Sequence, residues 1–288
     1  MELSDDQRFV YEEAEALGLT VTSPVLKNLH TFSDDATKVR VHTSDGPVFL
    51  KWGNTPEGKE RVVSEVANIK LLDEAGVSPE LIAHSEERAS YATEWIGGSD
   101  GAELPEDQRL DILWRTIGKI RAIDPDKMPT QQWQSLFLFK TDPADPIIPD
   151  EVPSSRKKAL EKAYFKVREL DGRTSLHGDF HTGNLIYSGD RLLVIDPEHM
   201  LVGVPGWDLV YYLGYDDAGM SPVKRASWLR THVVEKELRI LMDYLIARGY
   251  TWASCPPEKD KYGNIVERGM KNLQLTLPLY EELFSSKS

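Results

Sequence analysis

One stretch of the chain, residues 177–196, decides the fold. It reads His177-Gly-Asp-Phe-His-Thr-Gly-Asn184-Leu-Ile-Tyr-Ser-Gly-Asp190-Arg-Leu-Leu-Val-Ile-Asp196. Two apolar, β-prone runs, residues 185–187 and 192–195, flank the turn residues 188–190, and this pattern predicts a tight hairpin. Asn184 precedes the first strand and Asp196 follows the second. Antiparallel pairing is therefore expected to place these two side chains next to each other, about 5 Å apart.

The polar residues at this end of the hairpin have the chemistry of a magnesium site, because carboxylate and amide oxygens suit Mg²⁺. Asp179 lies in the loop that leads into the same end. The Asp-x-x-x-x-Asn spacing is that of a phosphoryl-transfer catalytic loop, in which the Asp accepts the proton of the attacking hydroxyl. In such a loop the Asn and a later Asp hold the metal. The sequence thus predicts Asp179, Asn184 and Asp196 as catalytic residues, with Asn184 and Asp196 as metal ligands.

The motif at residues 177–185 resembles the catalytic motif of the aminoglycoside phosphotransferase-like small-molecule kinases. This group also includes choline, fructosamine, homoserine and methylthioribose kinases. The resemblance runs from the predicted strands near residue 25 to Gly214. It implies an α+β, two-lobed, protein-kinase-like fold with ATP between the lobes. Residues 1–96 would form the small antiparallel-sheet, nucleotide-binding lobe, and residues 97–288 the larger helical lobe with the catalytic and substrate-binding residues.

Further positions match the family one by one. Lys51 ends an apolar strand, as the family's nucleotide-phosphate lysine does. Glu65 lies on the following helix and is expected to pair with Lys51, although Glu60 is a competing partner. The segment from Glu94 to Ile96 resembles the linker whose backbone binds the adenine edge. The resemblance therefore implies Lys51, Glu65, Glu94 and Ile96 as cofactor-binding residues.

The chain also departs from the family pattern. The expected phosphate-covering loop, residues 32–37, has no glycine and carries Asp34 and Asp35, two carboxylates that would repel phosphates. This leaves GTP open beside ATP as the nucleotide. The metal motif is Asp196-Pro197-Glu198, which resembles the methylthioribose kinase version, and we expect no mobile regulatory switch there.

Two further polar residues of the motif region have alternative roles. His181 is as well explained by a structural hydrogen bond as by catalysis. Asp208 matches a family aspartate that begins a helix and supports the catalytic loop, as an N-cap or as an acceptor of backbone donors.

The remaining elements follow from periodicity and turn residues. Strands are predicted at 25–31, 38–42, 48–52, 81–85 and 90–95, and helices at 4–17, 57–75, 110–120, 155–170, 222–248 and 260–284. Asp45-Gly46 is a typical hairpin turn between the second and third strands. The glycine cluster at 97–101 is the expected lobe boundary. The proline-rich segment 124–153 fits a linker or a substrate-side lid equally well.

Composition excludes several classes of protein. The 288 residues carry 34 basic and 47 acidic side chains, so the net charge of −13 disfavours binding to nucleic acid. The single cysteine, Cys255, rules out an intramolecular disulfide and argues against a cysteine-based zinc site. No apolar run approaches the roughly 20 residues of a membrane span, and the acidic start lacks the features of a secretory signal. A cytoplasmic protein is expected.

The predicted function is transfer of phosphate from ATP to a hydroxyl group of a small molecule. The acidic balance favours a cationic acceptor such as an aminoglycoside or an amino alcohol, and a sugar or homoserine-like acceptor is nearly as well supported. The alternatives are a non-catalytic relative that binds a nucleotide or small molecule, a kinase of protein side chains, and a metal hydrolase using His177, Asp179 and His181. The short interval from Asp196 to Asp208 disfavours a protein kinase. The sequence leaves the acceptor and the oligomeric state open.

Overall fold

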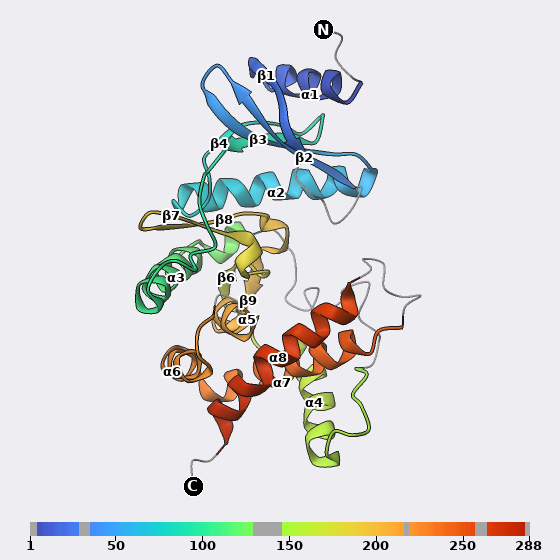
Figure 1. Cartoon of the computed structure of the whole chain (residues 1–288), viewed down its shortest axis with the longest axis vertical. Coiled ribbons are helices and arrows are strands. Elements are labelled where there is room, and N and C mark those ends of the chain that lie inside the picture. Colours follow the sequence, from blue (N-terminus) through green and yellow to red (C-terminus); the bar gives the residue numbers. More distant parts are fainter. Residues whose placement is uncertain (1–4, 29–34, 129–145, 216–218, 257–263, 286–288) are drawn as a thin grey trace. The chain divides into compact units, whose positions relative to one another are not determined.

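The computed structural model describes residues 5–28, 35–128, 146–215, 219–256 and 264–285 (Figure 1). The chain divides into two compact units. The first contains residues 1–99 and 186–198, and the second contains residues 100–185 and 199–288. The hairpin that follows the catalytic motif therefore packs with the N-terminal part of the chain. The predicted assignment of nucleotide binding to residues 1–96 and of catalysis to residues 97–288 stays a prediction.

A five-stranded antiparallel sheet forms the centre of the first unit. Its strand order is β1-β2-β3-β5-β4. The strands are β1 (Val21–Asn28), β2 (Ala36–Thr43), β3 (Gly46–Gly53), β4 (Leu81–Ser85) and β5 (Ser90–Glu94). All five predicted strands are found, with ends that differ by a few residues, and the predicted end of the first strand, residues 29–31, lies outside the described residues.

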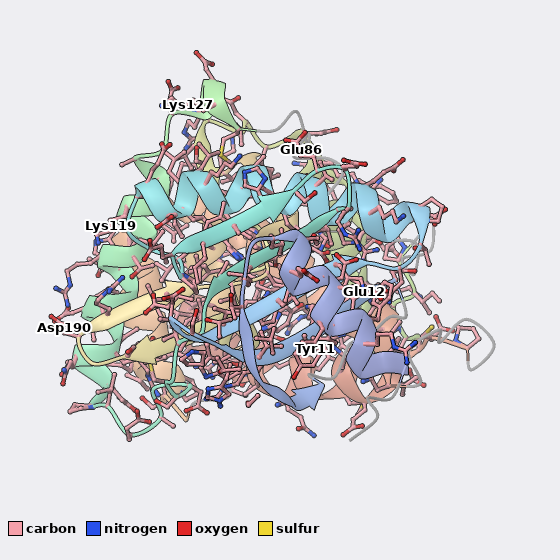
Figure 2. All side chains as sticks on the ribbon, turned by 90° about the horizontal axis from the view of Figure 1, so that it is seen from above. Tyr11, Glu12, Glu86, Lys119, Lys127 and Asp190 are labelled. Carbon is pink, nitrogen blue, oxygen red and sulfur yellow. The ribbon has the colours of Figure 1, made fainter. Side chains whose placement is uncertain are left out.

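One helix covers each face of this sheet, α1 (Asp5–Ala16) on one face and α2 (Pro56–Glu74) on the other (Figure 1). Successive strand residues point to opposite faces, so Val48 and Leu50 of β3 pack with α1 residues such as Ala14. The exposed side of α1, which carries Glu12, faces the viewer in Figure 2. The same alternation turns Lys51 toward the α2 face of the sheet.

Helix α2 begins and ends with residues suited to those positions. The Thr55 side chain accepts a hydrogen bond from the Gly58 N–H as an N-cap, and Pro56 occupies the first turn. Gly76 follows the helix with a φ of +66°, a left-handed conformation that favours glycine. The buried side of α2 carries Val62, Glu65, Val66, Asn68 and Ile69, so a glutamate and an asparagine lie within an otherwise apolar face.

The turn between β2 and β3 differs by one residue from the prediction. Thr43 pairs with Gly46, so the two loop residues are Ser44 and Asp45, and not Asp45 and Gly46. Gly46 has a φ of +126°, which lets it start the next strand directly after the turn. The resulting register places Lys38 of β2 directly opposite Lys51 of β3.

The hairpin predicted after the catalytic motif is present. It consists of β7 (Leu185–Ser188) and β8 (Arg191–Val194), with Gly189 in the turn at a φ of +63°. Asp190 of this turn is labelled at the edge of Figure 2. Within the first unit, the Val194 N–H donates to the Val77 carbonyl at 2.7 Å, which fixes the end of β8 beside the residue that follows α2.

The second unit is mainly helical. Its helices are α3 (Glu106–Arg121), α4 (Ser154–Lys166), α5 (Trp207–Tyr215), α6 (Pro222–His232), α7 (Glu235–Ala253) and α8 (Ile265–Phe284), and strands β6 (Thr174–Leu176) and β9 (Leu201–Gly203) form a small antiparallel pair. Helix α7 is the core element, since α4, α5 and α8 all pack against it. Trp207 of α5 and Tyr244 of α7 are among the largest fully buried side chains of the described residues.

The predicted single helix over residues 222–248 is wrong. Val233 and Val234 adopt extended backbone conformations and separate α6 from α7. Val233 is buried, and a Cβ built on Gly206 would lie 2.6 Å from its side chain, so tight packing holds this β-branched residue outside the helix. The predicted helix over 155–170 also ends early, at Lys166, and a 3₁₀ turn (Val167–Glu169) follows it.

Several predictions concern residues outside the described part. They are Ser4 at the start of the first predicted helix, loop residues 32–34 with Asp34, the start of the 260–284 helix, and most of the proline-rich segment, residues 129–145. No helix within the described residues is long and apolar enough to cross a membrane.

Candidate active site

A buried charged cluster lies between the sheet and α2 in the first unit. The Lys51 ammonium group is 2.6 Å from Glu65 Oε1 and 2.9 Å from Asp196 Oδ1. The Tyr91 hydroxyl donates to the other Glu65 oxygen at 3.0 Å. Glu60, the competing partner in the sequence, is exposed on α2. The side chains of Lys51 and Glu65 are 3% and 0% exposed, so this ion pair is shielded from solvent.

The charges of the cluster stabilise one another. Burial alone would lower the pKa of Lys51, but the Glu65 and Asp196 carboxylates outweigh this effect and raise it. Burial likewise works against ionised Asp196, but Lys51 and Lys38 outweigh it and hold the pKa of Asp196 below its usual range. Lys51 and Asp196 are therefore charged at neutral pH.

Asp196 is held in an unusual backbone conformation. Its φ is +57°, in the left-handed region that few residues other than glycine adopt. The two residues after it are anchored to α2, because Asn68 Nδ2 donates to the Pro197 carbonyl at 2.7 Å and Arg61 Nε lies 3.3 Å from Glu198 Oε2. Each residue of the Asp-Pro-Glu motif thus has a fixed polar partner.

Sequence reasoning missed Lys38. Its ammonium group lies 2.8 Å from Asp196 Oδ2, so a second lysine contacts the predicted metal ligand. The correct β2–β3 register would have identified this residue, because it places Lys38 opposite Lys51.

The predicted catalytic loop of the second unit is ordered by its own side chains. Asn184 Nδ2 donates to the Asp179 carbonyl at 3.0 Å and to Asp179 Oδ2 at 3.2 Å. The Gly183 N–H donates to His181 Nδ1 at 3.0 Å, so His181 carries its proton on Nε2. This nitrogen lies 3.4 Å from Asp179 Oδ2 and faces the carboxylate as a donor.

These contacts favour an ionised Asp179. Burial works against its charge, but the hydrogen bond from His181 and the nearby histidines His199 and His177 outweigh burial and hold the pKa of Asp179 far below its usual range. His181 thus has a structural role in this geometry, because it fixes the orientation of the Asp179 carboxylate.

Asp208 binds the backbone of the same loop. Its two carboxylate oxygens accept hydrogen bonds from the backbone N–H groups of His177 and Gly178, at 2.9 and 3.0 Å. Trp207 Nε1 donates to the Gly178 carbonyl at 2.7 Å. Gly178 has a φ of +86°, and a Cβ built there would lie 2.2 Å from the His199 carbonyl oxygen. The catalytic loop of protein kinases reads His-Arg-Asp, with arginine at the position of Gly178. An arginine side chain would not fit this backbone.

The free energy of unfolding is expected to depend on pH through the protonation of Asp208. Burial raises the pKa of Asp208 to about 6, despite the hydrogen bonds from His177 and Gly178. Between the unfolded-state pKa, near 4, and the folded-state pKa, about 6, only the folded protein keeps the proton on Asp208. This proton stabilises the folded state fully below about pH 4, and the stabilisation is lost as pH rises through about 6. Relative to Asp208→Asn, the wild type should therefore lose roughly 2 kcal/mol of unfolding free energy between pH 4.5 and 7.5. Urea denaturation at a series of pH values measures this difference, and a constant difference would contradict it.

The predicted adenine-binding segment follows β5. The Glu94 side chain is exposed, and its N–H donates to the Glu80 carbonyl at 2.9 Å. The Trp95 N–H donates to the Pro47 carbonyl at 3.2 Å. Ile96 makes no backbone hydrogen bond with any residue that the structure describes. The segment is thus held to β3 at Trp95.

The loop carboxylate of Asp35 is partly neutralised by α2. Arg61 Nη2 lies 3.3 Å from Asp35 Oδ2, and the Thr55 hydroxyl donates to the other oxygen at 3.4 Å. Arg61 therefore links this loop to Glu198 of the Asp-Pro-Glu motif.

The predicted site residues fall into two groups. Lys51, Glu65 and Asp196 meet in the first unit, and Asp179 and Asn184 meet in the second. The predicted adjacency of Asn184 and Asp196 stays a prediction. No three His, Cys, Asp or Glu side chains gather as metal ligands within the described ranges, so the metal-hydrolase alternative has no geometric support.

Comparison with known proteins identifies the family and the fold. The family model described as "Phosphotransferase enzyme family" (APH) matches residues 29–237. No curated protein sequence matches the chain. Among solved structures, choline kinase LicA from Streptococcus pneumoniae is 19% identical with a TM-score of 0.60, and the match covers 94% of this chain and 99% of LicA.

Two aminoglycoside phosphotransferase structures are also similar. The GDP complex of aminoglycoside 2′-phosphotransferase-IIIa is 13% identical, with a TM-score of 0.64 and coverage of 95% of this chain and 98% of that one. A thermostable mutant of APH(4)-Ia, in a ternary complex with ADP and hygromycin B, is 15% identical, with a TM-score of 0.63 and coverage of 99% and 100%. The predicted α+β, protein-kinase-like fold is thereby confirmed.

Proposed function

The chain belongs to the phosphotransferase enzyme family, and from this premise we propose that it transfers the γ-phosphoryl group of a nucleoside triphosphate to a hydroxyl group of a small molecule. The enzyme class predicted from the sequence, a small-molecule kinase, agrees with this family. The observation that carries the proposal is the buried cluster of Lys51, Glu65 and Asp196, because such a cluster is otherwise costly to bury.

The nucleotide site is proposed in the first unit. Lys51 would bind α- and β-phosphate oxygens, and Glu65 would hold Lys51 in place through the 2.6 Å ion pair. The backbone of Glu94 and Ile96 would bind the adenine edge, as the family resemblance of this segment implies. ATP and GTP both fit, since similar structures are complexes with ADP and with GDP.

Asp179 is proposed to orient the acceptor hydroxyl and to take its proton. The low pKa keeps its carboxylate ionised and makes it a weak base. Phosphoryl transfer passes through a loose transition state that needs little proton removal before bond formation, so positioning is the larger contribution. The hydrogen bonds from His181 and Asn184 supply that positioning.

A magnesium ion is proposed at Asn184 and Asp196. Asn184 Nδ2 is used by Asp179, which leaves Oδ1 for a cation, and the ionised Asp196 is a hard oxygen ligand that suits Mg²⁺. When bound, the ion would neutralise charge on the transferring phosphate. Both donors thus fit the metal that the family implies.

The acceptor is proposed to be a hydroxyl compound that carries a cationic group. The net charge of −13 favours such a partner, and similar structures include a choline kinase and a complex with hygromycin B. Sugar or homoserine-like acceptors are the second choice. Because nucleoside triphosphates are cytoplasmic substrates, the proposed location is the cytoplasm.

A thermal-shift titration tests the nucleotide site. The purified protein is titrated with ATP·Mg²⁺ and GTP·Mg²⁺, each with and without chelator, beside Asp196→Ala. A ligand that binds only the folded state at about 100 Kd adds about 2.7 kcal/mol of stability. We expect a metal-dependent shift with one nucleotide, lost in Asp196→Ala. No shift with either nucleotide at millimolar concentration would contradict the proposal and favour a non-catalytic protein with another ligand.

A further inference from the structure

Both oxygens of the Asp196 carboxylate are already in contact with a lysine. Lys51 lies 2.9 Å from Oδ1 and Lys38 lies 2.8 Å from Oδ2. A divalent cation on this carboxylate would be a like charge close to both ammonium groups, and the repulsion is strong in a partly buried site. Metal binding at Asp196 therefore requires at least one lysine to move.

Lys38 is the lysine that can move. The Lys51 side chain is 3% exposed and keeps Glu65 as a second anionic partner. The Lys38 side chain is 23% exposed, and within the described residues its partner is Asp196 alone. Once Asp196 binds a cation, Lys38 would be a partly buried charge that needs another anion.

Its place in the sheet determines which anion it can reach. Lys38 is the third residue of β2 and directly opposes Lys51, and directly opposed residues have Cβ atoms about 5 Å apart. Phosphates held by Lys51 are thus within reach of the long Lys38 side chain. The expected phosphate-covering loop, residues 32–37, contains no glycine, the residue that lets a backbone approach phosphates most closely, so side-chain cations have more phosphate charge to neutralise.

We propose that Lys38 is a second phosphate-binding lysine of this chain, which exchanges Asp196 for a nucleotide phosphate oxygen when a divalent cation binds Asp196. The inference rests on the nucleotide site proposed above. It assigns Lys38 both a positioning contact with the metal ligand and a direct contact with the phosphates.

Binding of Mg²⁺·ADP and of adenosine to wild type and Lys38→Met, measured by calorimetry, tests the exchange. We expect Lys38→Met to weaken Mg²⁺·ADP binding about tenfold, the effect of one lost charge contact, and to leave adenosine affinity within about twofold. Lys38→Arg should recover part of the loss. Lys70→Met, which removes an exposed lysine on α2, is the matched control and should bind as the wild type does.

Binding of Mn²⁺ alone, followed by electron paramagnetic resonance, is the second readout. Lys38→Met should bind Mn²⁺ more tightly than the wild type because a competitor for Asp196 is gone. Lys38→Gln replaces Lys38→Met if that variant does not fold. If folded Lys38→Met or Lys38→Gln binds Mg²⁺·ADP as tightly as the wild type, while Asp196→Ala does not bind it, the proposed role of Lys38 is wrong and the nucleotide site stands. A wild type that does not bind Mg²⁺·ADP would overturn the nucleotide site and this inference together.

Discussion

Asp179→Asn should lower turnover by about three orders of magnitude while changing the Kd of nucleotide·Mg²⁺ by no more than about threefold. The amide keeps the size of the side chain and can still accept from His181 or Asn184, so the loop should stay folded. The variant lacks the carboxylate oxygens that orient the acceptor hydroxyl and take its proton, and the negative charge is gone. Steady-state kinetics with an acceptor that the wild type phosphorylates measure turnover, and titration with nucleotide·Mg²⁺ measures affinity, so the two effects are separated.

The matched control for this substitution is Asp190→Asn. Asp190 lies exposed in the turn between β7 and β8, so the same chemical change there should leave turnover unchanged (Figure 2). Turnover of Asp179→Asn within tenfold of the wild type would refute the assigned role of Asp179.

Lys51→Met is expected to cost about 3 kcal/mol of stability, because it leaves Glu65 as a buried charge without its cation. Burial raises the pKa of Glu65, and Lys51 is the main group that lowers it. In the variant, Glu65 should therefore take up a proton on folding, so the loss of stability should be larger at pH 8 than at pH 6. Urea denaturation at both pH values measures the loss.

The double variant Lys51→Met/Glu65→Gln distinguishes charge from packing. It removes both members of the pair, so it should recover most of the lost stability but none of the nucleotide binding. Lys70→Met serves again as the control on α2. A double variant no more stable than Lys51→Met alone would show that lost packing, and not a stranded charge, explains the effect.

Local patterns were sufficient to predict most elements of the fold. The β7–β8 hairpin, the strands of the first unit and the buried face of α2 were readable because each depends on a short-range period or turn. Lys51 and Glu65 were predicted from the resemblance to the kinase family. Strand alternation and helix periodicity explain why both turn toward the interface between β3 and α2.

Features that depend on register or tertiary packing were not predictable. A turn at Asp45-Gly46 would have paired Lys51 with Arg40, whereas the observed turn at Ser44-Asp45 pairs it with Lys38. A shift of one residue in the turn thus concealed the second lysine of the cluster. The break at Val233 had no local signal such as proline or glycine, because it arises from packing against Gly206.

The positive φ of Asp196 was equally hidden. Asp196 and the adjacent Pro197 are contacted by side chains of β2, β3 and α2, which are far away in the sequence. Functional sites are where local preference is most often overridden by the surrounding structure.

The central claim is that this chain catalyses metal-dependent phosphoryl transfer to a small-molecule hydroxyl. The most direct test incubates wild type and Asp179→Asn with the nucleotide chosen by titration, Mg²⁺ and a pool of amino alcohols, aminoglycosides, sugars and homoserine, and analyses the pool by mass spectrometry. We predict that one class of acceptor gains the mass of one phosphoryl group with the wild type, that chelator abolishes the product, and that Asp179→Asn forms it about a thousandfold more slowly. Phosphorylated acceptor formed by Asp179→Asn at a rate within tenfold of the wild type, or a wild type that binds nucleotide and phosphorylates no acceptor in the pool, would contradict the account.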